Sequence, residues 1–359
     1  MKVLFVDTSI DGHHQTYLSG LLENCSEQAY AFIPEDEKFD CKGEYRKVIH
    51  PIDWQKKSLR DYLKWIEGIA SLAKKINPDI IHILDGDTIM RYFGMGLRKL
   101  DSWPVIITYH HFFEGKLRRL SYKMMLNGKN RMAIVHTSEI KRRLKEFNIV
   151  NVEHIEYPVF WYKQISNCNP LECKTKLDLP VDIPILGIIG ATDRYKGTMV
   201  LLESIKYIKN EVCIFFAGKE SDIKKEQIEL YNTNPKVKII TRLKWLTQNE
   251  YIDCLVACDY IVLPYTKEFN GASGPLADGV VANKNIIGSD YGSLGKIITE
   301  NKLGNVFEVD NSKMLAQLIN KVTKKSGQKE VEYLNYKEKL KPDNFYEKYK
   351  KVYNKFVNN

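Results

Sequence analysis

Long apolar segments are missing from this sequence of 359 residues. No uninterrupted apolar run approaches the ~20 residues that a membrane-spanning helix requires. The apolar part of the opening stretch MKVLFVDTS is too short for a signal peptide and is typical of a first strand. We therefore expect a cytoplasmic protein, with any membrane contact peripheral and on the inner face of the cell membrane.

Cysteine is sparse and irregularly placed. The seven cysteines are odd in number and scattered along the chain. Neither the pair Cys168 and Cys173 nor the pair Cys254 and Cys258 has the spacing or the histidine partners of a zinc site. We therefore expect free thiols in a reducing cytosol.

Two common binding fingerprints are absent as well. The first apolar run is followed by Asp11-Gly12-His13-His14 instead of G-x-G-x-x-G, which disfavours an NAD-dependent enzyme. The net charge of +9 comes without an RNP, zinc-finger or helix-turn-helix pattern. We therefore expect no nucleic-acid partner, whereas anionic small ligands or lipid surfaces fit the charge.

The chain does contain a repeated alternation of short apolar runs and amphipathic helical patterns, which is typical of an α/β protein. Its length favours two domains. The alternation stops at residues 157–170, a stretch with prolines and no periodicity, and restarts at Ile185. We therefore predict two doubly wound domains at 1–160 and 161–340, joined by this linker.

The periodicity also locates the individual elements. The expected strands are residues 2–7, 29–33, 46–50, 79–84, 105–108, 133–136, 152–156, 185–189, 212–217, 237–241, 260–263, 285–288 and 305–309. The expected helices include 15–24, 59–76, 88–100, 115–131, 139–147 capped by Ser138, and 198–208. In 341–359, apolar residues at helical spacing predict a last helix that buries this stripe, and in two-domain proteins of this kind such a helix can pack back on the first domain.

The strongest candidate for a ligand site lies between Ala257 and Asp290. A predicted strand leads through a polar loop into a helix that begins at Gly274-Pro275, where proline costs no hydrogen bond. Free N–H groups and the helix dipole would make this N-terminus a phosphate site. The loop residues brought there are Asn270, Gly271, Ala272 and Ser273. Asp278 lies about one turn inside, within reach of a ribose hydroxyl. An ordinary strand–loop–helix turn is the alternative.

Histidines gather where strands of the first domain end. His110 and His111 follow the strand at 105–108, and His13 and His14 follow Gly12 in the first loop. Because the carboxyl ends of parallel strands meet at one edge of a sheet, we expect these rings to line one cleft. For each ring alone, a surface or helix-capping role is the alternative.

Asp85-Gly86-Asp87 also follows a predicted strand of the first domain. Two carboxylates in this pattern could bind a divalent metal. We interpret them instead as lining the cleft or capping a helix, and we predict no metal site.

Three segments of the second half carry a family resemblance: LGIIGATDRYKG, WLTQNEYIDCLVACDYIVLPY and NGASGPLADGVVANKNIIGSDYGSLGKII. They are similar to the phosphate loop, the helix and strand before the donor loop, and the glutamate pair of glycosyltransferase family 4. Members of this family are retaining, nucleotide-sugar-dependent enzymes with the GT-B fold. The chain departs from the family where Asn270 and Asp278 replace the two glutamates. Ala191 replaces an arginine, for which Arg194 could substitute.

The resemblance implies two Rossmann-like domains facing across a cleft. It implies transfer of a sugar, with retention and without a metal, from a UDP- or GDP-sugar to a glycan or lipid-linked acceptor of a surface polysaccharide. Gly190, Lys196 and Arg194 would hold the diphosphate, unless they form a plain solvated turn. His110 would face the reacting sugar, with His111 as its competitor, and the loop of Gly12 would approach the donor phosphate.

Two other functions remain open. A catalytically silent sugar-nucleotide-binding or scaffolding subunit is favoured by Asn270 and Ala191. An epimerase with the same two domains would need acid and base residues that we cannot place.

Residues 116–131 mix lysines and arginines with bulky apolar side chains at helical spacing. We expect this segment to rest on an anionic membrane surface that carries a lipid-linked acceptor. A solvated helix on a core face is the alternative.

Overall fold

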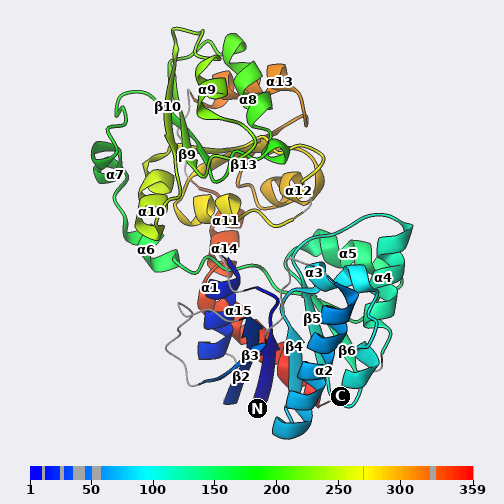
Figure 1. Ribbon diagram of the computed structural model, residues 1–359. Coiled ribbons are helices and arrows are strands. Elements are labelled where there is room, and N and C mark those ends of the chain that lie inside the picture. Colours follow the sequence, from blue (N-terminus) through cyan, green and yellow to red (C-terminus); the bar gives the residue numbers. More distant parts are fainter. Residues whose placement is uncertain are drawn as a thin grey trace. The chain divides into compact units, whose positions relative to one another are not determined.

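Two α/β units make up the chain (Figure 1). The first comprises Met1–Tyr157 with Asp343–Asn359, and the second Pro158–Pro342. The computed structural model describes residues 1–9, 13–24, 28–34, 45–50, 58–128, 130–269, 271–323 and 329–358. Gly12, Asn270 and the side chain of His13 lie outside the described residues.

The first unit is built on a parallel sheet, which is seven-stranded in the described part of the chain, with the order β3-β2-β1-β4-β5-β6-β7. Its central strands are buried because helices cover both faces, whereas the edge strand β3 is largely exposed. The strands are β1 (Lys2–Val6), β2 (Gln28–Pro34), β3 (Tyr45–His50), β4 (Ile80–Ile83), β5 (Val105–Tyr109), β6 (Arg131–Val135) and β7 (Val152–His154).

One face of this sheet packs against the helices between residues 59 and 146 and forms a hydrophobic core with them. They are α2 (Leu59–Ile76), α3 (Gly86–Ile89), the short 3-10 turns η1 (Met90–Tyr92) and η2 (Leu97–Leu100), α4 (Lys116–Leu126) and α5 (Ser138–Glu146). Leu4, Ile81 and Ile107 belong to this core, so alternate residues such as His82 point to the opposite face.

The opposite face carries α1 (His13–Asn24) and the terminal helix α15 (Pro342–Val357). Tyr349 of α15 bonds the hydroxyl of Tyr17 on α1, and the Tyr353 hydroxyl lies 2.6 Å from Nδ1 of the buried His82. The apolar stripe of the last helix is therefore buried against the first unit, as its spacing predicts.

The second unit has a parallel sheet, six-stranded within the described ranges, with the order β10-β9-β8-β11-β12-β13. Its strands are β8 (Ile185–Ile189), β9 (Val212–Gly218), β10 (Val237–Leu243), β11 (Tyr260–Leu263), β12 (Asn285–Ser289) and β13 (Gly304–Phe307). The predicted α/β class and doubly wound, Rossmann-like architecture of the two halves are confirmed.

Helices again cover both faces of the sheet, with a separate core on each. One core includes α6 (Tyr162–Asn167), α7 (Pro170–Lys176), α10 (Gln248–Ala257), α11 (Gly274–Val281), α12 (Gly292–Glu300) and α14 (Val331–Lys339). The other includes α8 (Thr198–Ser204), η4 (Ile205–Tyr207), α9 (Lys225–Glu229) and α13 (Ser312–Val322). The turn η3 (Arg194–Lys196) precedes α8.

Three local predictions were wrong. The helix expected at 88–100 is broken into α3, η1 and η2, because Phe93, Gly94 and Gly96 adopt positive φ angles that interrupt helical hydrogen bonding. The helix expected at 115–131 ends at Leu126, and Arg131 is a buried residue of β6 whose guanidinium group donates to Asp101.

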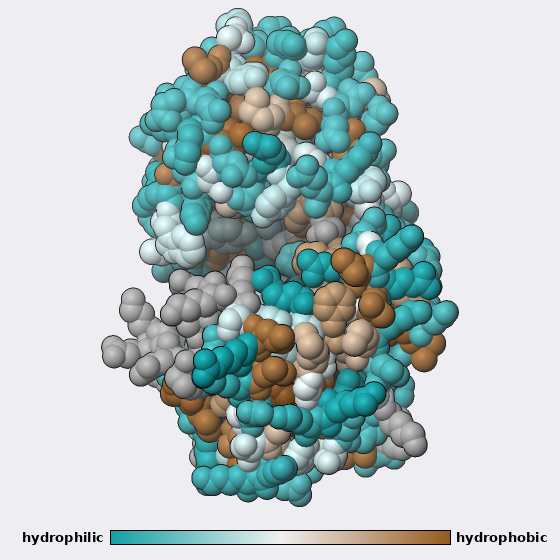
Figure 2. Space-filling view, turned by 45° about the vertical axis from the view of Figure 1, so that its right-hand side comes forward, coloured by the Kyte–Doolittle hydropathy of each residue, from teal (hydrophilic) through white to brown (hydrophobic). Residues whose placement is uncertain are grey.

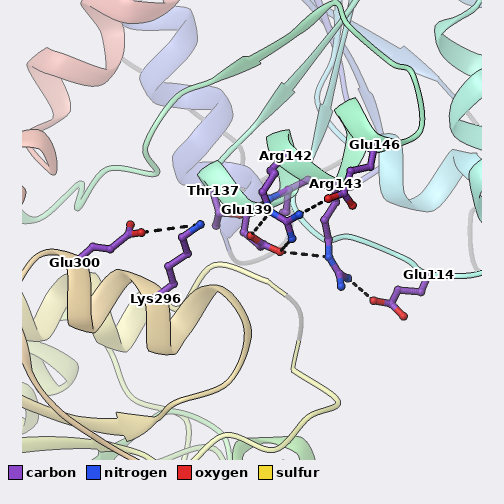
Figure 3. Close-up of polar contacts among 9 residues, drawn as sticks. Glu114, Thr137, Glu139, Arg142, Arg143, Glu146, Lys296 and Glu300 are labelled. Atoms are coloured by element: carbon purple, nitrogen blue, oxygen red, sulfur yellow. Dashed lines mark hydrogen bonds and ion pairs between the residues drawn. The ribbon is translucent and has the colours of Figure 1, made fainter.

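The third error concerns the cap of α5. Ser138 is its first helical residue, and the preceding Thr137 is the cap, because its side chain accepts the N–H of Ile140 at 3.2 Å (Figure 3). Across the residues that the structure describes, no helix has both the length and the apolar character needed to cross a bilayer.

Candidate functional site

The predicted site residues gather at comparable places in the two units. In each sheet the strand order reverses beside the first strand, between β1 and β4 in one and between β8 and β11 in the other. The loops after two such strands run in opposite directions, so the carboxyl edge is open there for a ligand.

In the second unit, the loop after β8 brings Lys196 back over the end of its own strand. Gly190 has a φ of +121°, and a Cβ there would lie 3.2 Å from the Lys196 amine. Gly197 has a φ of +69°, and a Cβ there would lie 1.8 Å from the carbonyl oxygen of Pro264. Only glycine permits this close approach, which fixes the turn against the loop that follows β11.

The ammonium group of Lys196 is partly withdrawn from solvent. Its side chain is 19% exposed, and its Nζ lies 3.7 Å from a carboxylate oxygen of Asp193. Burial lowers the pKa of Lys196, while the charge of Asp193 opposes this effect. Arg194 lies in the same turn with an exposed side chain, and its backbone N–H donates to Asp222 at 2.9 Å. The structure thus brings Lys196 onto Gly190 and leaves Arg194 at the rim.

The N-terminus of α11 reaches the same place, since Pro275 would lie 3.9 Å from a Cβ at Gly190. Ser273 caps the helix by accepting the N–H of Leu276 at 3.2 Å, and its Oγ lies 3.1 Å from the Tyr265 hydroxyl. Pro275 has no N–H. The exposed Gly274 is therefore the one of the first three helical positions whose N–H keeps no partner among the described residues. Gly271 is buried and Ala272 exposed in the loop before it.

Asp278 lies deeper than its sequence position suggests. It is 9% exposed, and one of its carboxylate oxygens accepts the Tyr251 hydroxyl of α10 at 2.6 Å. Burial raises its pKa to about 7, although the hydrogen bond from Tyr251 opposes this. Tyr251 was assigned no role from the sequence, because its partner is 27 positions away.

In the first unit, the end of β1 forms a carboxylate–imidazole pair with the start of α1. Nδ1 of His14 lies 3.1 Å from both carboxylate oxygens of Asp7. Burial alone would lower the pKa of His14, but the hydrogen bond and charge of Asp7 outweigh it and raise the pKa to about 9. The side chain of Thr8 donates to Asp85 at 2.5 Å, which links the ends of β1 and β4.

The Asp85-Gly86-Asp87 segment has two distinct roles. Asp85 caps α3 by accepting the N–H of Thr88 at 3.0 Å, which confirms the predicted capping role. Asp87 accepts the backbone N–H groups of His110 and His111, at 3.1 and 3.0 Å. Among the described residues, no group of three or more His, Cys, Asp and Glu is placed to hold a metal ion.

Two histidines at the end of β5 are held in different ways. Nε2 of His110 lies 3.0 Å from the carbonyl oxygen of Leu84, so this nitrogen carries the hydrogen and Nδ1 is an acceptor in the neutral ring. His111 is half exposed, and its Nδ1 lies 3.0 Å from Asp87. That hydrogen bond raises the pKa of His111 above its ordinary value.

The structure therefore places His14, His110, His111 and Asp85 at one edge of the first sheet. The rings of His110 and His14 are 6.3 Å apart. Asp7 and Thr8 belong to this edge too, although the sequence was not interpreted that way. The signal available for Asp7 was its position as a polar residue at the end of a buried strand.

Two family descriptions match the sequence. Glycosyl transferases group 1 matches residues 172–341, and Glycosyl transferase 4-like matches residues 2–138. No curated protein compared with the sequence is significantly similar to it.

Solved structures with the same fold cover nearly the whole chain. A glycosyltransferase from Rickettsia africae has 18% sequence identity and a TM-score of 0.73, covering 99% of this chain and 98% of its own. HepE of Anabaena, in complex with UDP, has 12% identity and a TM-score of 0.77, covering 99% and 100%. WaaG, a glycosyltransferase involved in lipopolysaccharide biosynthesis, has 13% identity and a TM-score of 0.66, covering 99% and 100%.

Proposed function

Because the chain is a glycosyltransferase with the GT-B fold, we propose that its donor is a nucleoside-diphosphate sugar such as a UDP- or GDP-sugar. The acceptor in this proposal is a glycan or lipid-linked hydroxyl of a surface polysaccharide. Retention of the anomeric configuration, membership of family 4 and independence of a metal are also part of the proposal. They are supported by the resemblance of the three segments in the second half of the chain.

One observation carries the donor assignment: the Lys196 amine lies over Gly190, beside the N-terminus of α11. A cation, a helix dipole and the Gly274 N–H converge there at the open edge of the sheet. Departure of a nucleoside diphosphate leaves negative charge on its phosphates. A partly desolvated ammonium group can stabilise that charge more strongly as the bond breaks than before.

The edge of the first unit supplies acceptor-side groups in this proposal. His14 is held by Asp7 and carries a proton at neutral pH, so it can donate to a sugar oxygen. Because Nε2 of His110 is bonded to the Leu84 carbonyl, its Nδ1 is the nitrogen that would accept a hydroxyl proton, whereas His111 is oriented by Asp87. Asp85 is occupied by Thr8 and Thr88 and therefore has a supporting role.

Solved complexes support the donor class by analogy. HepE has been solved in complex with UDP, with UDP and glucose, and with UDP-glucose. We extend the same ligand class to this chain, and we propose a cytoplasmic location with peripheral contact to the membrane through α4, the helical part of residues 116–131.

Thermal-shift titrations with UDP, GDP, ADP and their common sugars test the proposal. We expect one diphosphate series to raise Tm, and its sugar to be hydrolysed slowly or transferred. Failure of every nucleotide to stabilise the protein would contradict the donor site.

A catalytically silent sugar-nucleotide-binding or scaffolding subunit is the second candidate. It is favoured by the buried Asp278, one oxygen of which is already engaged by Tyr251. Nucleotide binding without turnover across a broad acceptor panel would select this second function.

A further inference from the structure

The helix α4 has three distinct sides. Its buried side consists of Ser121, Tyr122 and Met125. Leu117, Leu120 and Met124 share a second side, because residues three and four apart are neighbours on a helix. They are 69%, 47% and 44% exposed, which is unusual for three large apolar side chains in a row.

The third side of α4 is basic. Lys116, Arg119 and Lys123 are exposed and recur at intervals of three and four residues. The helix contains no acidic residue, and within the described residues none of these three cations forms an ion pair with a carboxylate. Arg119 instead lies over the ring of Phe147, 5.1 Å from its centroid.

Helix stability does not account for these cations. Lys116 and Arg119 lie in the first turns, at the positive end of the helix dipole, where a cation costs up to about 1 kcal/mol. Gly115 at the cap position supplies no side-chain hydrogen bond. Cations at these positions therefore lower the stability of the helix, and binding to an anionic ligand would offset this cost.

The neighbouring helix α5 provides the contrast (Figure 3). Its Arg142 pairs with Glu139 and Glu146, and its Arg143 pairs with Glu114. Arg142 and Arg143 of α5 thus have acidic partners within the unit, whereas Lys116, Arg119 and Lys123 of α4 have no carboxylate partner among the described residues.

A groove of about 600 Å³ with a mixed apolar and polar lining adjoins α4. Leu120 and Met124 line it from the helix, and Ile149 and Val150 line it from the turn between α5 and β7. Val150 is 80% exposed. Lys123 and Arg131 also line the groove, together with three asparagines, so cations and apolar side chains lie side by side there. In Figure 2, brown apolar side chains lie among teal polar ones on the side of the first unit that holds α4 and α5 in Figure 1.

We propose that α4 and the turn before β7 form a docking surface for a bilayer that contains anionic phospholipids. Leu117, Leu120, Met124 and Val150 enter the boundary between headgroups and acyl chains, and Lys116, Arg119 and Lys123 bind lipid phosphates. The occupant follows from the pairing of apolar and basic sides on one helix, because a bilayer surface offers both complementary layers. The purpose of this contact, access to a lipid-linked acceptor, rests on the proposed function.

Co-sedimentation with vesicles tests the proposal. The full-length protein is mixed with vesicles of phosphatidylcholine alone, or of phosphatidylcholine and phosphatidylglycerol in equal parts. We expect binding only to the anionic vesicles, weakening as salt is added. The variant K116Q/R119Q/K123Q should bind roughly 100-fold more weakly, because three surface cations act together. The variant L117S/L120S/M124S should also lose binding, because the apolar side no longer inserts.

The matched control is K64Q/K74Q/K75Q on α2, which removes the same charge from exposed positions of the same unit. It should bind anionic vesicles within about twofold of the parent, since long-range charge alone is screened. Equal losses in K116Q/R119Q/K123Q and in the α2 control K64Q/K74Q/K75Q, or no vesicle binding by the parent, would overturn the proposal.

The same samples separate this inference from the proposed function. The α4 variants should keep the parent's Tm and its thermal shift with the nucleotide. A parent that binds vesicles but no nucleotide would remove the donor site and leave the docking surface in place.

Discussion

Replacing Lys196 by Met is the sharpest test of the donor site. Met fills a similar volume and removes only the charge. A cation about 4 Å from a phosphate oxygen, at an effective dielectric constant of about 20, contributes about 4 kcal/mol. Because the Lys196 side chain is still 19% exposed, solvent screening reduces this to about 2–4 kcal/mol. The expected loss in kcat/KM is therefore about 30- to 1000-fold.

The Lys196→Met variant should be at least as stable as the parent. Burial lowers the pKa of Lys196, which means that the folded protein disfavours its charge. Lys196→Met removes that penalty, so its Tm should equal or exceed that of the parent. Loss of activity without loss of Tm would show that the lysine acts on the substrate rather than on the fold.

The assay is steady-state turnover of the nucleotide sugar identified by thermal shift. Lys224→Met is the matched control, because this lysine is 54% exposed and pairs with Glu220 on the surface. It should retain parental kcat/KM. If Lys196→Met stays within twofold of the parent, residues 190–197 form a plain solvated turn and the reasoning fails.

The remaining predictions concern buried or capping groups. Asp278→Ala should weaken nucleotide binding and preserve the fold; unchanged affinity in calorimetry would place the ribose elsewhere. With a pKa raised by burial from 3.8 to about 7, Asp278 makes folding stability fall as pH rises between these values, by up to about 4 kcal/mol, and Asp278→Asn should flatten that slope in urea unfolding. Tyr353→Phe should cost about 1–3 kcal/mol in the same measurement by leaving His82 without that partner. Burial lowers the pKa of His82 from 6.5 to about 3, so its contribution to stability is lost as pH falls through this range. Thr137→Ala should cost about 1 kcal/mol and Ser138→Ala close to nothing, and the reverse order would reject Thr137 as the cap.

The strands could be predicted from the sequence because parallel sheets are buried on both faces and leave continuous apolar runs. The break in the helix expected at 88–100 could not be predicted from the sequence pattern. Its apolar pattern is helical, but Phe93 adopts a φ of +53°, a conformation that tertiary contacts must impose on a non-glycine residue. The last helix was predictable because a stripe of aromatic residues on a terminal helix must be buried against another part of the protein.

Positions at strand ends were also predictable, whereas side-chain partners were not. Gly190 and Lys196 come together because both belong to one short loop, and local geometry determines their distance. Asp278 is engaged by Tyr251 of another helix, and no short-range pattern encodes that pair. The same holds for Asp87, whose carboxylate orients the backbone of His110 from 23 positions away.

Sheet topology explains why the candidate site residues could be predicted from the ends of strands. In both units the first strand lies inside the sheet, and the next strand on its other side arrives only after two further strands have been added. The loops on the two sides of this reversal therefore diverge. They leave an open space at the carboxyl edge of the sheet, where backbone N–H groups and polar side chains can contact a ligand. Asp7 and Lys196 follow the two first strands, and Asp85 and Ser273 follow the strands beside them. Asp85 and Ser273 also cap α3 and α11, so their removal should cost stability as well as activity. Within the described residues Lys196 caps no helix, so loss of activity at this position is interpretable as chemistry.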